Sequence, residues 1–154
     1  MEEFEKNFKE AVKHLQIADH MTYVTFPLVN ENRLLLKIFD EIYLSIIYCV
    51  NTILYYEYLY KRIELYDSYR DNLDTFVRIA RDYNLNHEQV KRITEIIDLN
   101  KRHKKSAMEF VRNDKVVIMS DNLGTQIIDI ILIKQYLLLA KELLMKVKIG
   151  TKRR

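Results

Sequence analysis

The chain has 154 residues, and its 25 lysines and arginines against 22 acidic residues give a net charge of +3. This length fits one domain over residues 1–154, and so small a net charge points neither towards nor away from nucleic acid. Two glycines and one proline are few, which favours long helices with short links over sheets that turn often. The single cysteine, Cys49, excludes an internal disulfide and fits a reducing, cytoplasmic location.

The first predicted helix covers residues 2–21, where apolar side chains recur at helical spacing. Pro27 lacks a backbone N–H and disfavours helical geometry at Phe26. We therefore expect the chain to leave the helical conformation before Pro27, and Asn30 to cap the next helix.

The chain is organised around residues 31–62, which contain neither glycine nor proline. A helix of this length would extend about 48 Å. Glu57 lies within its apolar part, and a carboxylate in lipid is costly, so we expect a helix buried in protein and no membrane contact. Two rows at seven-residue spacing predict lengthwise packing against other helices: Leu35, Ile42, Cys49, Tyr56 and Ile63, and beside them Phe39, Ile46, Ile53 and Tyr60.

Two shorter helices follow, over residues 69–83 and from Asn86 to about residue 105. Asn86 and Gln89 have the spacing of a capping box, which predicts where the second of them begins. The helical period stops at residues 106–122, where two strand-like runs flank Asn113-Asp114. This segment is either a β-hairpin or an irregular loop.

The last predicted helix covers residues 123–148. The expected fold class is all-α, an antiparallel bundle of about five helices. The long helix over residues 31–62 and the last helix are expected to form its central pair.

Tyrosine is concentrated in one part of the chain, because eight of the eleven tyrosines lie between Tyr43 and Tyr69. Four of them point around more than half of the helix circumference, so a single core cannot bury them all. Tyrosine suits interfaces because it combines an apolar ring with a polar hydroxyl. These four predict the surface of a homodimer, or otherwise the edges of the bundle: Tyr55, Tyr56, Tyr58 and Tyr60. Glu57, among them, is expected to pair with Lys61 or with a residue of another helix.

Basic residues cluster on either side of residue 106, and concentrated positive charge attracts phosphate backbones. The alternative is a solvated helix end whose cations complement the helix dipole. A second basic group, with residues 152–154, ends the chain. The predicted nucleic-acid contacts are Lys101, Arg102, Lys104, Lys105, Arg112 and Lys115.

The sequence predicts no metal site and no cofactor. His14 and His20 are six residues apart and so lie on different faces of a helix. The chain has no His-Glu-x-x-His zinc motif, no Glu-x-x-His pair and no glycine-rich phosphate loop.

Arg112-Asn113, placed before the last helix of a compact bundle with one long helix, resembles the HEPN superfamily. The resemblance implies a small, usually dimeric helical domain of prokaryotic toxin–antitoxin and defence systems. Many of its members are RNases with an arginine followed by a histidine after four to six residues. Here Val117, Ile118 and Met119 stand where that histidine is expected. Residues 106–122 also resemble uncharacterised archaeal helical proteins.

The favoured interpretation is a non-catalytic HEPN-like domain that dimerises and binds RNA or a protein partner. One alternative is a HEPN-type RNase that uses Arg112, or Arg81 with His87, the pair in this chain that has five residues between arginine and histidine. The other alternative is a purely structural subunit of an assembly. The sequence does not identify a substrate or a pathway.

Overall fold

The structure is a computed structural model that describes residues 1–106, 108–120 and 124–152. The chain is mostly helical, as the sequence predicts. The helices are α1 (Glu3–His20), α2 (Phe26–Val29), α3 (Leu34–Leu59), α4 (Tyr69–Ile79), α5 (His87–Lys104) and α6 (Ile130–Gly150), with a π-helical turn, η1 (Met21–Thr25), and a 3-10 turn, η2 (Ala80–Tyr83). The strands are β1 (Met108–Arg112), β2 (Lys115–Met119) and β3 (Thr125–Ile128).

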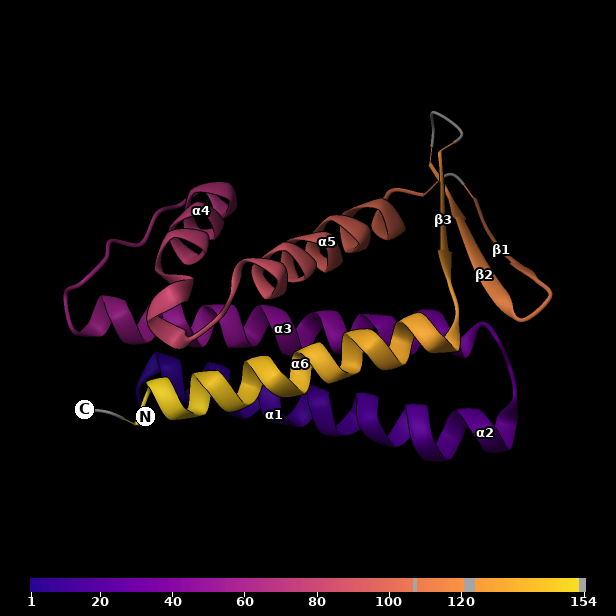
Figure 1. Ribbon diagram of the computed structural model, residues 1–154, viewed down its shortest axis with the longest axis horizontal. Coiled ribbons are helices and arrows are strands. Elements are labelled where there is room, and N and C mark those ends of the chain that lie inside the picture. The colour runs from indigo at the N-terminus through magenta and orange to yellow at the C-terminus, as the bar shows by residue number, and fades with distance from the viewer. Residues whose placement is uncertain (107, 121–123, 153–154) are drawn as a thin grey trace.

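Helix α3 is the central element, with α1 and α6 packed along it (Figure 1). Helices α1 and α5 run in the opposite direction to α3, whereas α6 runs in the same direction, so the bundle is not antiparallel throughout. Figure 1 places the sheet at the end of the body where α3 and α6 begin. The N-terminus and the end of α6 lie together at the other end.

The prediction of an all-α fold is wrong in one respect, because the chain also forms a three-stranded antiparallel sheet in the order β1-β2-β3. For residues 106–122 the sequence left a hairpin and an irregular loop open, and the described part forms the hairpin of β1 and β2. Residues 107, 121 and 122 are outside the described part. Thr125–Ile128, expected in the last helix, is the third strand. The helix begins only at Ile130, where the Asp129 carboxylate accepts a hydrogen bond from the Leu132 backbone N–H at 2.9 Å.

Asn113 makes the hairpin turn. Its φ of 57° is left-handed, a conformation that asparagine tolerates better than most residues. Arg112 and Lys115 face each other across the turn as the last pair of the β1–β2 ladder. The Asn32 side chain donates a hydrogen bond to the Asn113 carbonyl at 3.0 Å, which fixes the tip of the hairpin beside the start of α3.

The link between α1 and α3 also differs from the prediction. Phe26 has helical angles, φ −60° and ψ −47°, and its N–H bonds to the Met21 carbonyl five residues back. This π-helical turn, η1, places Pro27 in the first turn of α2, where a missing N–H costs little. Asn30 ends α2 in a left-handed conformation, φ 51°, and does not cap α3, whose N-cap is Arg33.

The core lies where α3 meets α1, α5 and α6, and it contains the inner face of the sheet. Side chains alternate along a strand, and the register places Glu109, Val111, Val116, Ile118, Gln126 and Ile128 on that inner face. Arg112 and Lys115 lie on the other face. Between α1 and α3 the packing is close because Ala11 and Ala18 are fully buried, and the Ser45 hydroxyl donates to the Ala11 carbonyl at 2.9 Å.

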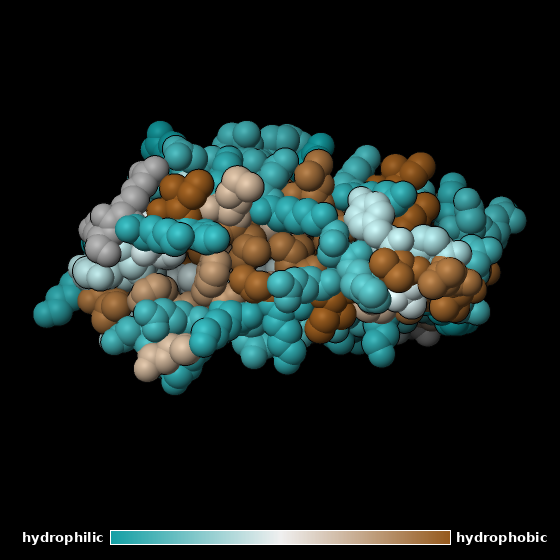
Figure 2. Space-filling view, turned by 90° about the horizontal axis from the view of Figure 1, so that it is seen from below, coloured by the Kyte–Doolittle hydropathy of each residue, from teal (hydrophilic) through white to brown (hydrophobic). Residues whose placement is uncertain are grey.

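Apolar side chains are also exposed outside the core. Figure 2, which views the molecule from below, shows brown apolar surface between teal polar side chains along the whole body. On α6, three large side chains at seven-residue spacing are more than half exposed: Ile131, Leu138 and Met145. No helix within residues 1–106, 108–120 and 124–152 combines the length and the apolar character that crossing a membrane requires.

Candidate polyanion-binding groove

The C-terminal turn of α5 and the sheet enclose a groove of about 610 Å³. Helix α5 begins at the predicted capping box, in which Asn86 and Gln89 each accept from the other's backbone N–H. At the other end of this 18-residue helix, the last turn presents cations. Lys101, Arg102 and Lys105 line one wall of the groove, and Ile118, Ser120, Gly124, Thr125 and Gln126 form the rest of the lining.

The groove is electropositive. Its described lining contains three cations and neither aspartate nor glutamate, and none of these cations forms an ion pair among the described residues. Lys101 Nζ lies 5.8 Å from the centroid of the Tyr69 ring on α4, a cation–π contact that leaves its charge uncompensated. Together with the Thr125 hydroxyl and the Gln126 amide, the groove offers the donors that phosphate oxygens accept.

The structure divides the predicted basic cluster into two parts. Arg112 and Lys115 are exposed at the turn of the hairpin, whereas the groove lies at the opposite end of the strands, beside Ser120 and Gly124. Lys104 is exposed on α5 but does not line the groove. Of the six residues predicted to contact nucleic acid, three therefore line one groove and the other three lie outside it.

His103 connects α5 to two other elements beside the groove. Its Nε2 lies 3.2 Å from Asp40 Oδ1 on α3, and its Nδ1 makes a short contact with Glu109 Oε2 on β1. The ring is 12% exposed. The contact with Asp40, followed by that with Glu109, raises the pKa of His103 above its ordinary value, although burial acts in the opposite direction.

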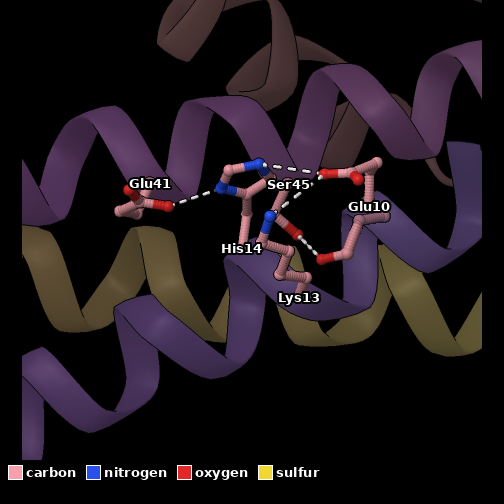
Figure 3. A network of polar contacts seen from close by, with 6 residues as sticks. Glu10, Lys13, His14, Glu41 and Ser45 are labelled. Carbon is pink, nitrogen blue, oxygen red and sulfur yellow. Dashed lines mark hydrogen bonds and ion pairs between the residues drawn. The ribbon is translucent and has the colours of Figure 1, made fainter.

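A similar arrangement holds α1 against α3 (Figure 3). His14 Nδ1 lies 2.5 Å from Glu41 Oε2, and its Nε2 lies 3.4 Å from Glu10 Oε2. The ring stacks on Tyr48 with 5.6 Å between the ring centroids. The pair Glu10 and His14 follows from helical spacing, whereas Glu41 is distant in the chain and gave no sequence signal. Within the described ranges, no three His, Cys, Asp or Glu side chains converge in a way that could hold a metal ion.

The predicted tyrosine surface is partly core. Tyr56 is 2% exposed and packs edge-on against Phe4 with 5.0 Å between the ring centroids. Tyr55 is half-buried, and Tyr58 and Tyr60 are exposed.

Glu57 is buried and pairs with Arg62, not with the predicted Lys61. The Arg62 guanidinium also lies 5.6 Å and 5.1 Å from the ring centroids of Tyr56 and Tyr60. Hydrogen bonding and charge at Glu57 raise the pKa of Arg62, although burial is the largest single influence and acts to lower it.

The candidate catalytic residues do not converge in the described structure. Arg112 is on the outer face of the hairpin, whereas Glu109, which holds His103, is on the inner face. Arg81 is exposed in η2 and His87 is exposed at the start of α5, with no contact between them among the described hydrogen bonds and ion pairs. In the basic C-terminal region, Lys146 donates to the Asn84 carbonyl. Residues 153 and 154 are outside the described part.

A scan of protein-family models and a search of curated proteins both find no match to this chain.

Proposed function

We propose that this chain is a non-catalytic, HEPN-like, cytoplasmic domain that binds RNA through the phosphate backbone. The observation that carries the proposal is the groove between α5 and the sheet, with Lys101, Arg102 and Lys105 on one wall. Cations at the C-terminus of a helix also complement its dipole. That role alone does not explain why these cations line a groove whose other wall is the sheet. Contacts of this kind position a strand without reading its sequence, so we expect affinity for RNA of any sequence.

The experiment compares two variants that remove the same charge from different places. Lys101→Gln with Lys105→Gln alters the groove, and Arg112→Gln with Lys115→Gln alters the tip of the hairpin. Binding to one unstructured RNA is measured by fluorescence anisotropy over a range of salt concentrations. Each lost phosphate contact flattens the slope of log affinity against log salt by about 0.7 on a single strand. We expect a change of about 1.4 for the groove variant and little change for the hairpin variant.

Two results would reject the proposal. The first is wild-type protein that does not bind at low salt, where the electrostatic contribution is largest. The second is an equal change of slope in both variants, which would mean that net charge alone attracts the RNA. Circular dichroism of each variant checks the fold, since exposed substitutions usually change stability by no more than about 0.5 kcal/mol.

We also propose that the domain forms a homodimer, and exposed surface on α6 supports this. Ile131, Leu138 and Met145 are equally spaced along the helix and more than half exposed. A row with equal spacing on both sides of Leu138 fits an antiparallel copy of itself, because Ile131 then meets Met145 of the second copy. Lys141 is bound to Asp19 at 2.6 Å and Lys134 lies over the Tyr23 ring, so the flanking cations already have partners.

Analytical ultracentrifugation of Leu138→Lys and Tyr58→Lys distinguishes this surface from the tyrosine surface. A dimer that dissociates in Leu138→Lys alone places the interface on α6, and one that dissociates in Tyr58→Lys alone places it at the end of α3. A wild-type monomer at high concentration would reject the dimer and leave a protein partner as the ligand of these surfaces.

A further inference from the structure

His103 lies beside the groove, where it links the elements that form its two walls. It belongs to the last turn of α5, which also carries Arg102, a groove residue. Its Nδ1 contacts Glu109 of β1, and Glu109 is the cross-strand partner of Ile118, which lines the opposite wall. The contact between His103 and Glu109 therefore links one wall to the other.

The third element at this point is α3. Asp40 Oδ1 lies 3.2 Å from His103 Nε2, and the Phe39 ring meets the imidazole edge-on, at an angle of 85° with 6.3 Å between the centroids. Asp40 from α3 and Glu109 from β1 are the charged groups in contact with the ring among the described residues. Two ionised carboxylates in contact with one imidazole are both stabilised when the ring carries a positive charge.

We propose that His103 is the positioning residue of the groove, and that its imidazolium form holds α5 and the sheet at the spacing in which Lys101, Arg102 and Lys105 bind RNA. This inference rests on the proposed RNA-binding function and adds its regulation by pH. Loss of the proton removes the positive charge that both carboxylates contact, which weakens the link between the walls. The affinity of the groove then falls as the pH rises.

The direction of the pH dependence follows from the contacts. Both carboxylates stabilise the charged ring, so the transition occurs above about pH 6.5, the ordinary value for histidine. Lysine and arginine side chains remain charged in this range. A change in affinity between about pH 6 and pH 9 is therefore not expected from the phosphate contacts themselves.

The test measures RNA affinity at constant salt over about pH 6 to pH 9 for wild type, His103→Gln and His87→Gln. His87 is exposed at the start of α5 and serves as the matched control. As the pH rises over this range, we expect the RNA affinity of the wild type and of His87→Gln to fall by about fivefold or more. Fivefold is the lower end of the range over which one site typically changes the affinity of another. His103→Gln should bind weakly at every pH, with a flat profile.

A second variant, Glu109→Gln, keeps the histidine and removes one carboxylate. Its midpoint should move to lower pH, a shift that a merely structural role of His103 does not produce. If His103→Gln fails to fold, the midpoint of Glu109→Gln still tests the proposal. If the wild type binds RNA and the affinity of His103→Gln falls with pH in parallel with that of the wild type, this inference is overturned and the proposed function stands. No binding by the wild type at any pH overturns both.

Discussion

Asp40 and Glu41 are neighbours on α3, and each holds a histidine of a different helix. Glu41 Oε2 lies 2.5 Å from His14 Nδ1 on α1, and Asp40 Oδ1 lies 3.2 Å from His103 Nε2 on α5. Successive residues of a helix point about 100° apart. The two carboxylates therefore reach elements on two sides of α3 and tie α1, α3 and α5 together at one level.

The stability of the fold should depend on pH through His103. The folded-state pKa of His103 is raised above the unfolded value. Its contribution is therefore fully present below about pH 6.5 and is lost as the pH rises through the folded-state value. Asp40→Asn removes the largest cause of that shift. We expect urea unfolding to show a larger stability difference between wild type and Asp40→Asn at about pH 6 than at about pH 9.

The control is Asp74→Asn, which neutralises an exposed carboxylate on α4. Its stability difference from wild type should be small and should not change with pH. A difference for Asp40→Asn that is the same at both pH values would contradict the assignment.

Much of the helical framework could be predicted because the helices are long and carry local start signals. The Asn86 and Gln89 capping box is visible within four residues, and the apolar rows of α3 repeat at a regular spacing along the whole helix. Strand β3 was missed because a strand of four residues leads directly into an apolar helix, and a period of two cannot be recognised over so short a run. The π-helical turn before Pro27 was missed because a proline at this position is expected to end the helix.

The groove could be predicted in part. Lys101, Arg102 and Lys105 are close in the sequence, so the local cluster of basic residues identified them. Their separation from Arg112 and Lys115 depends on the direction of the hairpin, which closeness in the sequence does not reveal. The carboxylates that hold His14 and His103 come from α3, and pairing over such a distance has no local pattern.

Cys49 should not react while the protein is folded. The side chain is fully buried in α3, and burial raises the pKa of its thiol far above the ordinary value. We expect a thiol reagent such as DTNB to label the protein at the rate of unfolding, and rapidly in denaturant. Fast labelling of the native protein would mean that the helices around Cys49 open locally.

Arg62 should contribute more to stability than its neighbour Lys61. Glu57 is 6% exposed and depends on Arg62 as its partner. Arg62→Ala leaves the carboxylate buried without that partner and should cost about 1–3 kcal/mol in urea unfolding. Lys61→Asn is the control, because asparagine tolerates the left-handed φ of 59° at this position. Equal losses in the two variants would show that the Glu57–Arg62 pair is not the cause.

Gly150 should resist replacement by alanine, although it lies in a helix. In the middle of a helix, alanine is better than glycine by roughly 0.5–1 kcal/mol, and Gly150 is the last residue of α6. At this position, however, a Cβ would come within 2.4 Å of the Tyr83 ring, which is 4% exposed. The ring belongs to η2, so its displacement would disturb the contact between η2 and the end of α6. We expect Gly150→Ala to lower the melting temperature of the wild type. In a Tyr83→Leu background, the same Gly150→Ala change should lower the melting temperature by less. A melting temperature of Gly150→Ala at or above that of wild type would show that the ring moves aside at no cost.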